Sequence, residues 1–374
     1  MPEAPRLIEL APFDREEGGS FVPQLAATCE EASSRGWRSE IVLPETARTR
    51  QWVPDLEACG ARIHFAPPIN RRGRPAWLAS LLGPDRARTV LHSHFTTWDL
   101  AVASVASRDP RRQAYWHVHT VLARDPMSIA RHALKFTLVG RRVDGVFCPA
   151  VNIADALRHR GIPAKELRVI PSGIDPDAFP LLGDRARREA KKALGLPEGS
   201  TVLLHFGWDW RIKGGELFLH AMEELLRRNG EDLIALAQRG GEKAADTARR
   251  LGIEDHVRVI GMIHDVHQLF GAADVFLAVS AREGMPYSVL ESVCSGTPVI
   301  ASDLPGHAVV AEAVPACTLV PRRATDIADA VQAILDTSPE TRARQAFSSR
   351  EWVKENFSAV RTAELTLDVF EGKV

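Results

Sequence analysis

Short apolar runs alternate along the chain with longer stretches in which apolar residues recur at helical spacing. The run RLIELAP leads into a polar loop, DREEGGS, and then into VPQLAATCEEASSRG, which has a helical pattern and a glycine stop at Gly36. The same rhythm continues through SEIVLP, ARIHFAP, TVLHSHF, QAYWHVHT and GVFCPA. This alternation predicts a parallel sheet with helices on both faces.

The pattern starts again in the second half of the chain. The connector LRVIPSGIDPDAFP is rich in proline, glycine and aspartate, and strand-like runs follow it at TVLLHFGW, DLIALAQRGG, VRVIGMI, DVFLAVS and TPVIASD. We therefore expect an α/β protein with two doubly wound, Rossmann-like domains facing each other across a cleft. We place these domains at residues 1–168 and 169–355, with a final amphipathic helix over residues 356–374.

Composition narrows the class of protein. A length of 374 residues suits two domains, and 45% hydrophobic with 25% charged residues is typical of a globular chain. A formal net charge of −1 gives no reason to expect a nucleic-acid partner. The five cysteines include no pair at CxxC spacing, which indicates reduced thiols. Because we find no signal-peptide pattern and no long apolar run, we expect a cytoplasmic protein.

The stretch REGMPYSVLES carries two glutamates with a turn between them. Glu283 comes just after the buried strand predicted at DVFLAVS, and Glu291 lies one turn inside the helix that follows. The first N–H groups of a helix lack intrahelical partners and can receive a phosphate, while a carboxylate can bind the two hydroxyls of a sugar. Both glutamates can thus hold one nucleotide-sugar. Equally, a glutamate near a helix start can simply complement the helix dipole.

The longer segment EGMPYSVLESVCSGTPVIASDLPG resembles the sugar-nucleotide signature of glycosyltransferase family 4, the retaining enzymes of GT-B fold with a Glu-x7-Glu motif. The segment VIPSGIDPDAF resembles the interdomain motif of that family, and LLHFGWDWRIKGGELFLHAM resembles its Gly…Lys-Gly unit. ENFSAVRTAELTLDVF resembles its closing helix, which packs back on the N-terminal domain. The resemblance covers most of the chain and is strongest in the second half.

The resemblance implies a role for each matching residue of the second half. Glu283 would contact the transferred sugar and Glu291 the ribose. Lys213, with Arg211 nearby, would neutralise the diphosphate as it leaves. Main-chain N–H groups would hold the sugar hydroxyls and the distal phosphate, and they belong to Gly284, Met285, Tyr287 and Ser288.

In the first half, the resemblance implies that Gly18 and Gly19 allow close backbone approach to the phosphate. His119 matches the family histidine near the reacting end of the sugar, and His94 is an acceptor-side candidate. The sequence departs from the family pattern in four places. Trp208 replaces an arginine, Pro286 a glycine and Ser172 an asparagine, and the glutamate that usually follows a later Gly-Gly loop is missing from LPGHAVV.

Two further patterns suggest metal or membrane binding. His92 with His94, and His117 with His119, form H-x-H pairs that could bind a metal, yet a polar strand end explains them without one, and we expect no metal. The Asp175-Pro176-Asp177 sequence lies in the connector, where it favours a turn. SIARHALKFTLVGRRV is basic and apolar enough to contact an anionic membrane, but we favour an outer helix of the first domain.

We therefore predict an enzyme that transfers a hexosyl unit from a nucleoside-diphosphate sugar, expected to be a UDP-sugar, to an acceptor hydroxyl. The acceptor would be a small molecule, a glycan or a lipid-linked molecule. The family resemblance implies retention by front-face attack and requires neither metal nor cofactor. Two alternatives stay open: a nucleotide-sugar 2-epimerase, and a catalytically silent subunit that binds the nucleotide-sugar.

Overall fold

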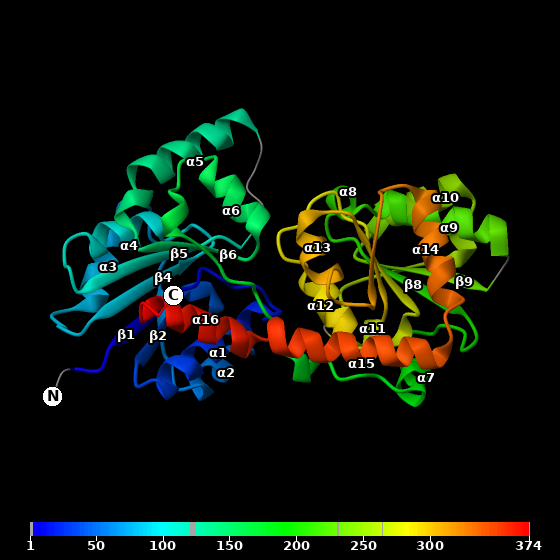
Figure 1. Ribbon diagram of the computed structural model, residues 1–374, viewed down its shortest axis with the longest axis horizontal. Helices are drawn as coiled ribbons and strands as arrows, with labels where there is room; N and C mark the ends of the chain where they lie inside the picture. The colour runs from blue at the N-terminus through cyan, green and yellow to red at the C-terminus, as the bar shows by residue number, and fades with distance from the viewer. Residues whose placement is uncertain (1–2, 120–124, 230–231, 264, 374) are drawn as a thin grey trace. The chain divides into compact units, whose positions relative to one another are not determined.

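The computed structural model describes residues 3–119, 125–229, 232–263 and 265–373. Two compact units divide the chain, and each is described by itself (Figure 1). Unit 1 consists of Met1–Asp175 with Ser358–Val374, and unit 2 consists of Pro176–Phe357. Unit 2 is therefore an insertion in the sequence of unit 1.

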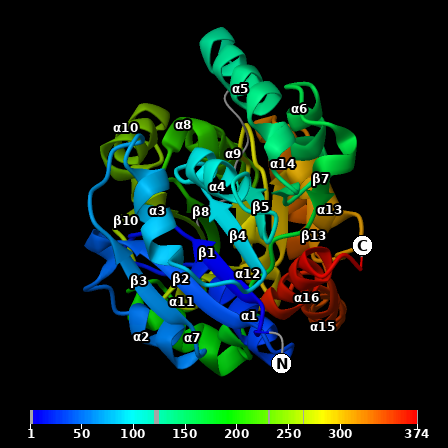
Figure 2. The same cartoon turned by 90° about the vertical axis from the view of Figure 1, so that its left-hand side faces the viewer.

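Unit 1 is built on a seven-stranded sheet in the order β3-β2-β1-β4-β5-β6-β7. The labels of Figure 2 follow this order from β3 to β5. The pairs between neighbouring strands are parallel. Chain order reverses between β1 and β4, as in a doubly wound fold. The strands are β1 (Arg6–Leu10), β2 (Arg38–Pro44), β3 (Arg62–Ala66), β4 (Thr89–His94), β5 (Arg112–His117), β6 (Gly145–Cys148) and β7 (Leu167–Val169).

Helices cover both faces of this sheet, as the sequence predicts (Figure 1). Successive strand residues point to opposite faces. Ile8 accordingly packs in the core with residues of α3, α4 and α6, whereas Leu7 packs with residues of α16. The helices are α1 (Phe21–Ser34), α2 (Val53–Ala58), α3 (Arg74–Leu82), α4 (Asp99–Ala106), α5 (Pro126–Leu138), α6 (Val151–Arg158) and α16 (Ala359–Phe370).

Helix α5 corresponds to the basic stretch singled out in the sequence. It begins at Pro126, where the Asp125 side chain accepts a hydrogen bond from the Ser128 N–H. Its Phe136 is buried in the core of unit 1, and Lys135 pairs with the buried Asp99 of α4. These contacts make α5 an outer helix of the unit. Among the described residues, no helix combines the length and the apolar character needed to cross a membrane.

Helix α16 completes the core of unit 1. Leu367 and Phe370 are fully buried, and Phe370 packs against the rings of Tyr115 and Phe147. Two alanines of α16 also pack on Ala27 of α1. Helix α16 therefore covers one face of the sheet although 182 residues of unit 2 separate it from the rest of unit 1.

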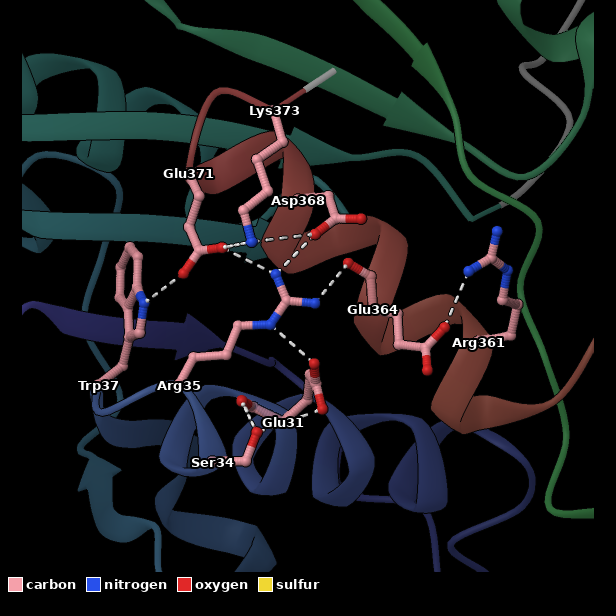
Figure 3. Close-up of polar contacts among 9 residues, drawn as sticks. All are labelled: Glu31, Ser34, Arg35, Trp37, Arg361, Glu364, Asp368, Glu371 and Lys373. Carbon is pink, nitrogen blue, oxygen red and sulfur yellow. Dashed lines mark hydrogen bonds and ion pairs between the residues drawn. The ribbon is translucent and has the colours of Figure 1, made fainter.

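Arg35, just after α1, ties α1 to α16 (Figure 3). Its guanidinium donates to Glu31 at 2.7 Å, to Asp368 at 2.6 Å and to Glu371 at 2.8 Å. Its side chain is 18% exposed. Because these are charge-assisted hydrogen bonds on a mostly buried group, they contribute more than a surface ion pair does.

Replacing Arg35 with methionine should therefore loosen α16. We expect a loss of about 1.5 kcal/mol, or about tenfold faster amide hydrogen exchange in α16. Arg361→Met is the matched control, because Arg361 lies on the same helix in an exposed pair with Glu364 (Figure 3). Equal exchange rates in the two variants would contradict the role given to Arg35.

The chain passes between the units twice, and the two connecting segments contact each other within unit 1. Ile174 and Ser358 form an isolated parallel bridge, and the Ala359 N–H donates to the Ile174 carbonyl at 2.7 Å. A Cβ at Gly173 would lie 2.2 Å from the Ser358 carbonyl oxygen, so only glycine permits this approach. The contacts divide the chain after residues 175 and 357, whereas the sequence pattern predicts boundaries after residues 168 and 355.

Unit 2 contains a six-stranded sheet in the order β10-β9-β8-β11-β12-β13, again with parallel pairs. Chain order reverses between β8 and β11. The two sheets confirm the predicted pair of doubly wound, Rossmann-like domains. The strands are β8 (Thr201–Phe206), β9 (Leu233–Gln238), β10 (Val257–Ile260), β11 (Val275–Ala278), β12 (Val299–Ser302) and β13 (Cys317–Val320).

The helices of unit 2 follow its strands in the predicted alternation. A core of apolar residues from β8, β9, β11 and α9 includes Leu203, Leu219 and Leu277, all fully buried. The helices are α7 (Asp184–Ala193), α8 (Trp210–Lys213), α9 (Gly215–Asn229), α10 (Gly241–Leu251), α11 (Val266–Ala272), α12 (Tyr287–Cys294), α13 (Pro305–Ala311), α14 (Ala324–Leu335) and α15 (Pro339–Asn356).

Candidate active site

The strand order of unit 2 brings two distant segments together. Strands β8 and β11 are neighbours at the point where chain order reverses, which is where doubly wound sheets bind ligands. The loop after β8 leads into α8, and the loop after β11 leads into α12. These loops are joined by a main-chain hydrogen bond of 2.7 Å from the Ala281 N–H to the Ile212 carbonyl.

Lys213 and Glu283 form an ion pair at this place. The Lys213 Nζ lies 2.6 Å from Glu283 Oε1, and the Ser280 hydroxyl donates to the same oxygen at 2.7 Å. The two charged side chains are 14% and 15% exposed. The structure thus joins two residues for which the family resemblance implies separate roles, and adds Ser280, which no sequence pattern indicates.

Glycines allow the backbone around this pair to pack closely. Gly214 has φ +82°, and a Cβ there would lie 2.3 Å from the Val279 carbonyl oxygen. A Cβ at Gly306, in the first turn of α13, would lie 2.7 Å from the Gly284 carbonyl oxygen. The loop that carries Glu283 is therefore held between α8 and α13 by contacts that larger residues would block.

Helix α12 begins directly after this loop. Pro286 is its N-cap and provides no side-chain hydrogen bond. The Tyr287 N–H donates to the Met285 carbonyl at 3.2 Å, so a phosphate held by this N–H would replace that bond. Ser288 and Glu291 follow on the same helix and are half-buried. The predicted order of Gly284, Met285, Tyr287, Ser288 and Glu291 along one turn and helix is present.

The two tryptophans of the β8 loop differ in environment. Trp210 is 6% exposed, and a Cβ at Gly215 would lie 2.2 Å from its ring, so Trp210 is a packing residue. Trp208 is 58% exposed, and the Lys213 Nζ lies 4.7 Å from the centre of its ring. Trp208 also lines an open hollow of about 510 Å³, formed with Gly207, Asp209, Trp210, Arg239, Gly240, Glu242 and Lys243.

Arg211 does not share the environment of Lys213. It is exposed, and residues two apart on a helix do not lie on the same face. Lys213 is thus the cation that the fold places against Glu283, while Arg211 lies at the surface of the same short helix.

In unit 1, chain order reverses between β1 and β4, and Gly18, Gly19 and His94 lie after or at the end of these two strands. Gly19, with φ +53°, ends the loop that leads into α1. A Cβ at Gly18 would lie 3.0 Å from a methyl carbon of Val22. Phe21, at the start of α1, packs edge-on against the rings of His94 and His119, with centroids 5.2 and 5.4 Å away.

His94 and His119 contact each other through ring nitrogens. His94 Nδ1 lies 2.8 Å from His119 Nε2, and His94 Nε2 lies 2.7 Å from Glu9 Oε2. Burial lowers the pKa of His94 to about 4, so His94 is neutral at pH 7. His94 is only 5% exposed, which suits holding His119 better than touching an acceptor. His119 itself follows β5, which ends at His117, and is not on the strand as predicted.

Each unit has a doubly wound sheet with candidate side chains near the point where chain order reverses. Two such domains in one chain are the architecture of the GT-B fold. Solved structures confirm this architecture. A glycosyltransferase of Rickettsia africae matches with a TM-score of 0.82 over 99% of this chain and 98% of its own, at 14% identity. HepE of Anabaena, solved in complex with UDP, matches with a TM-score of 0.81 over 98% of this chain and 100% of its own, at 16% identity.

Two family models match the sequence. The model described as Glycosyltransferase Family 4 matches residues 24–178, and the one described as Glycosyl transferases group 1 matches residues 200–337. The two models match segments of both units, which confirms the resemblance to family 4 glycosyltransferases that the sequence segments indicate. The Glu-x7-Glu motif and retention stay predictions.

Curated relatives agree with the family assignment. A D-inositol 3-phosphate glycosyltransferase of Corynebacterium aurimucosum is 26% identical over 272 residues, which are 67% of this chain and 64% of the relative. An alpha-monoglucosyldiacylglycerol synthase of Streptococcus pneumoniae is 32% identical over 169 residues, 44% of this chain and 38% of the relative. The match thus spans less than two thirds of either relative.

Proposed function

We propose that this protein transfers a hexosyl unit from a nucleoside-diphosphate sugar to an acceptor hydroxyl, with retention and without a metal in the reaction. The ion pair between Lys213 and Glu283 carries this proposal. It places a cation and a carboxylate at the reversal point of unit 2, directly before the start of α12. A UDP-sugar is the donor we propose, supported by the UDP that Anabaena HepE binds at a similar fold.

The donor residues lie in unit 2. Glu283 accepts hydrogen bonds from the sugar hydroxyls, and Glu291 from the ribose hydroxyls. The N–H groups at Gly284 and Met285 face the sugar, and those at Tyr287 and Ser288 hold the distal phosphate at the start of α12. The hollow beside Trp208 provides room for part of the nucleotide next to Lys213.

Lys213 has the leading part in the chemistry. The bond from the anomeric carbon to the diphosphate breaks, and the Lys213 ammonium neutralises the charge that develops on the leaving oxygen. The exposed Arg211 contributes less. The ammonium has three donors, so it can bind phosphate while keeping Glu283 in place. Glu283 is already bonded to Lys213 and Ser280, which does not suit the carboxylate nucleophile of a two-step retaining reaction.

Front-face attack is the course consistent with that geometry. The acceptor oxygen forms its bond to the anomeric carbon on the face from which the diphosphate leaves, and its proton passes to the leaving phosphate oxygen. In unit 1 we assign the Gly18–Gly19 loop to the phosphate and His119 to the sugar, with His94 holding His119. The acceptor is a small molecule, a glycan or a lipid-linked molecule. The five cysteines all lie among the described residues and form no disulfide, which supports a cytoplasmic reaction.

The test is nucleotide release from a panel of UDP-, GDP- and ADP-sugars, with and without EDTA. We expect slow hydrolysis of one donor that EDTA does not stop. Glu291→Ala should raise the KM for that donor about tenfold, because a charged acceptor to the ribose is lost. Glu189→Ala, which changes an exposed glutamate of α7, is the matched control.

Other outcomes distinguish the alternatives. An isomerised donor without free nucleotide would mean a 2-epimerase. A donor that raises the melting temperature but is never hydrolysed, with any acceptor tried, would mean a binding subunit. The sequence offers a reason for the second outcome, because Trp208 stands where the family pattern has an arginine and cannot provide a charged contact to phosphate.

A further inference from the structure

Three buried histidines meet in the core of unit 1. His92 and His94 lie on β4 and His117 on the neighbouring β5, and all three are at most 5% exposed. One ring nitrogen from each can be chosen so that all three nitrogens lie within 4.8 Å of one another. Because alternate residues of a strand share a face, the two strands direct these rings to the same side of the sheet.

Hydrogen bonding leaves ring nitrogens without partners at this place. His92 Nδ1 lies 2.8 Å from Glu9 Oε2, so Nδ1 donates to this carboxylate. Among the described residues, His92 Nε2 has no hydrogen-bond partner, and neither has either ring nitrogen of His117. Such buried, unsatisfied nitrogens are costly, and they call for a donor or a cation.

A small void lies between these rings and two helices. It measures about 10 Å³ and is lined by the three histidines, by Gln24 and Thr28 of α1, and by Thr362 and Thr366 of α16, along with Phe21 and Leu25. That is the size of a single water molecule or ion. The hydroxyl groups of the two α16 threonines suit a water that completes the coordination of an ion.

Glu9 provides an outer partner for such a site. Its carboxylate is only 1% exposed, and its Oε2 lies 2.8 Å from His92 Nδ1 and 2.7 Å from His94 Nε2. A carboxylate behind a histidine is a frequent outer partner of a zinc ligand.

We propose that His92, His94 and His117 bind one zinc ion in the core of unit 1, with Glu9 orienting His92. His94 exchanges one of its present hydrogen bonds for the metal. Three imidazoles and a water give the four-coordinate shell that zinc prefers. The ion would hold β4 and β5 together within unit 1. Its binding does not depend on the proposed sugar transfer, although its ligand His94 also contacts His119.

The test uses the full chain without a histidine tag, stripped with chelator and titrated with Co²⁺. We expect one equivalent to bind per chain, with the intense visible absorption of four-coordinate cobalt, and to raise the melting temperature. Zinc should abolish that absorption by displacement. Metal analysis of chain purified without chelator should find zinc.

Two variants separate coordination from loss of fold. His117→Phe keeps a ring in the core and removes both unpartnered nitrogens, so it should stay folded and lose the cobalt spectrum. His205→Phe is the matched control, because His205 of β8 is equally buried with an unpartnered Nε2 but belongs to no such cluster of the described residues. No binding, binding unchanged in His117→Phe, or a thiolate charge-transfer band would overturn the proposal, leaving the void to water or the metal to a cysteine.

Discussion

Lys213→Ala should lower kcat for donor hydrolysis by about 10²–10³-fold, the usual effect of removing one group that stabilises charge in a transition state. The Lys213 ammonium is held 2.6 Å from Glu283 and at the reversal point of unit 2. The ammonium is therefore already in place to interact with a leaving diphosphate. The measurement is steady-state release of nucleotide from the donor that the panel identifies.

The control for this variant is Lys192→Ala, which removes an exposed lysine of α7 in the same unit. Arg211→Ala should have a much smaller effect than Lys213→Ala, because Arg211 lies on another side of α8. A change confined to KM in Lys213→Ala would show that the lysine binds the donor without assisting its cleavage.

A double-mutant cycle tests whether Lys213 acts together with Glu283. Groups in direct contact are not additive, so Lys213→Ala with Glu283→Ala should cost far less than the product of the two single effects. Additive effects would mean that Lys213 and Glu283, although paired in the free protein, do not act together during the reaction.

Gly214→Ala should cost about 3 kcal/mol of unfolding free energy, the upper part of the usual range for one substitution. Two physical effects combine at this position. Gly214 has a left-handed φ of +82°, and a new Cβ would lie 2.3 Å from the Val279 carbonyl oxygen. Because Val279 leads into the loop of Glu283, the same displacement should lower donor turnover.

Gly252→Ala separates these two effects. Gly252 has a similar φ of +68°, but a Cβ there would meet nothing within 4 Å. Gly252→Ala should lower the free energy of unfolding only by the cost of a left-handed φ at a residue with a side chain, about 1 kcal/mol, and should leave donor turnover unchanged. Urea denaturation of both variants gives the comparison, and equal losses would show that the close approach at Gly214 contributes nothing.

The sequence was sufficient for the two doubly wound sheets, because each strand is a short apolar run between helical stretches. It also predicted that Glu283 follows a buried strand and that α12 starts after Pro286. It could not predict the contact of Glu283 with Lys213, because that depends on β8 and β11 becoming neighbours. Strand order is decided by packing across the whole sheet and has no local signal.

Other features were missed for related reasons. Glu9 stands in the apolar run RLIELAP, where a single acidic residue is a weak signal of a buried carboxylate. The two H-x-H pairs were interpreted as polar strand ends, because nothing in the sequence shows that β4 and β5 are adjacent. Trp208 and Trp210 are indistinguishable by type, and only the glycines packed on Trp210 decide which of them is buried.

The insertion of unit 2 before α16 has a consequence for how the chain is made. During synthesis, the seven strands of unit 1 leave the ribosome well before the helix that covers Leu7, Tyr115 and Phe147. Until Leu367 and Phe370 arrive, that apolar face has only part of its cover, from residues such as Ala32 and Trp37, while unit 2 is contiguous and can fold as soon as it emerges. The later part of the chain should thus complete its core first, and the earlier part should finish only afterwards.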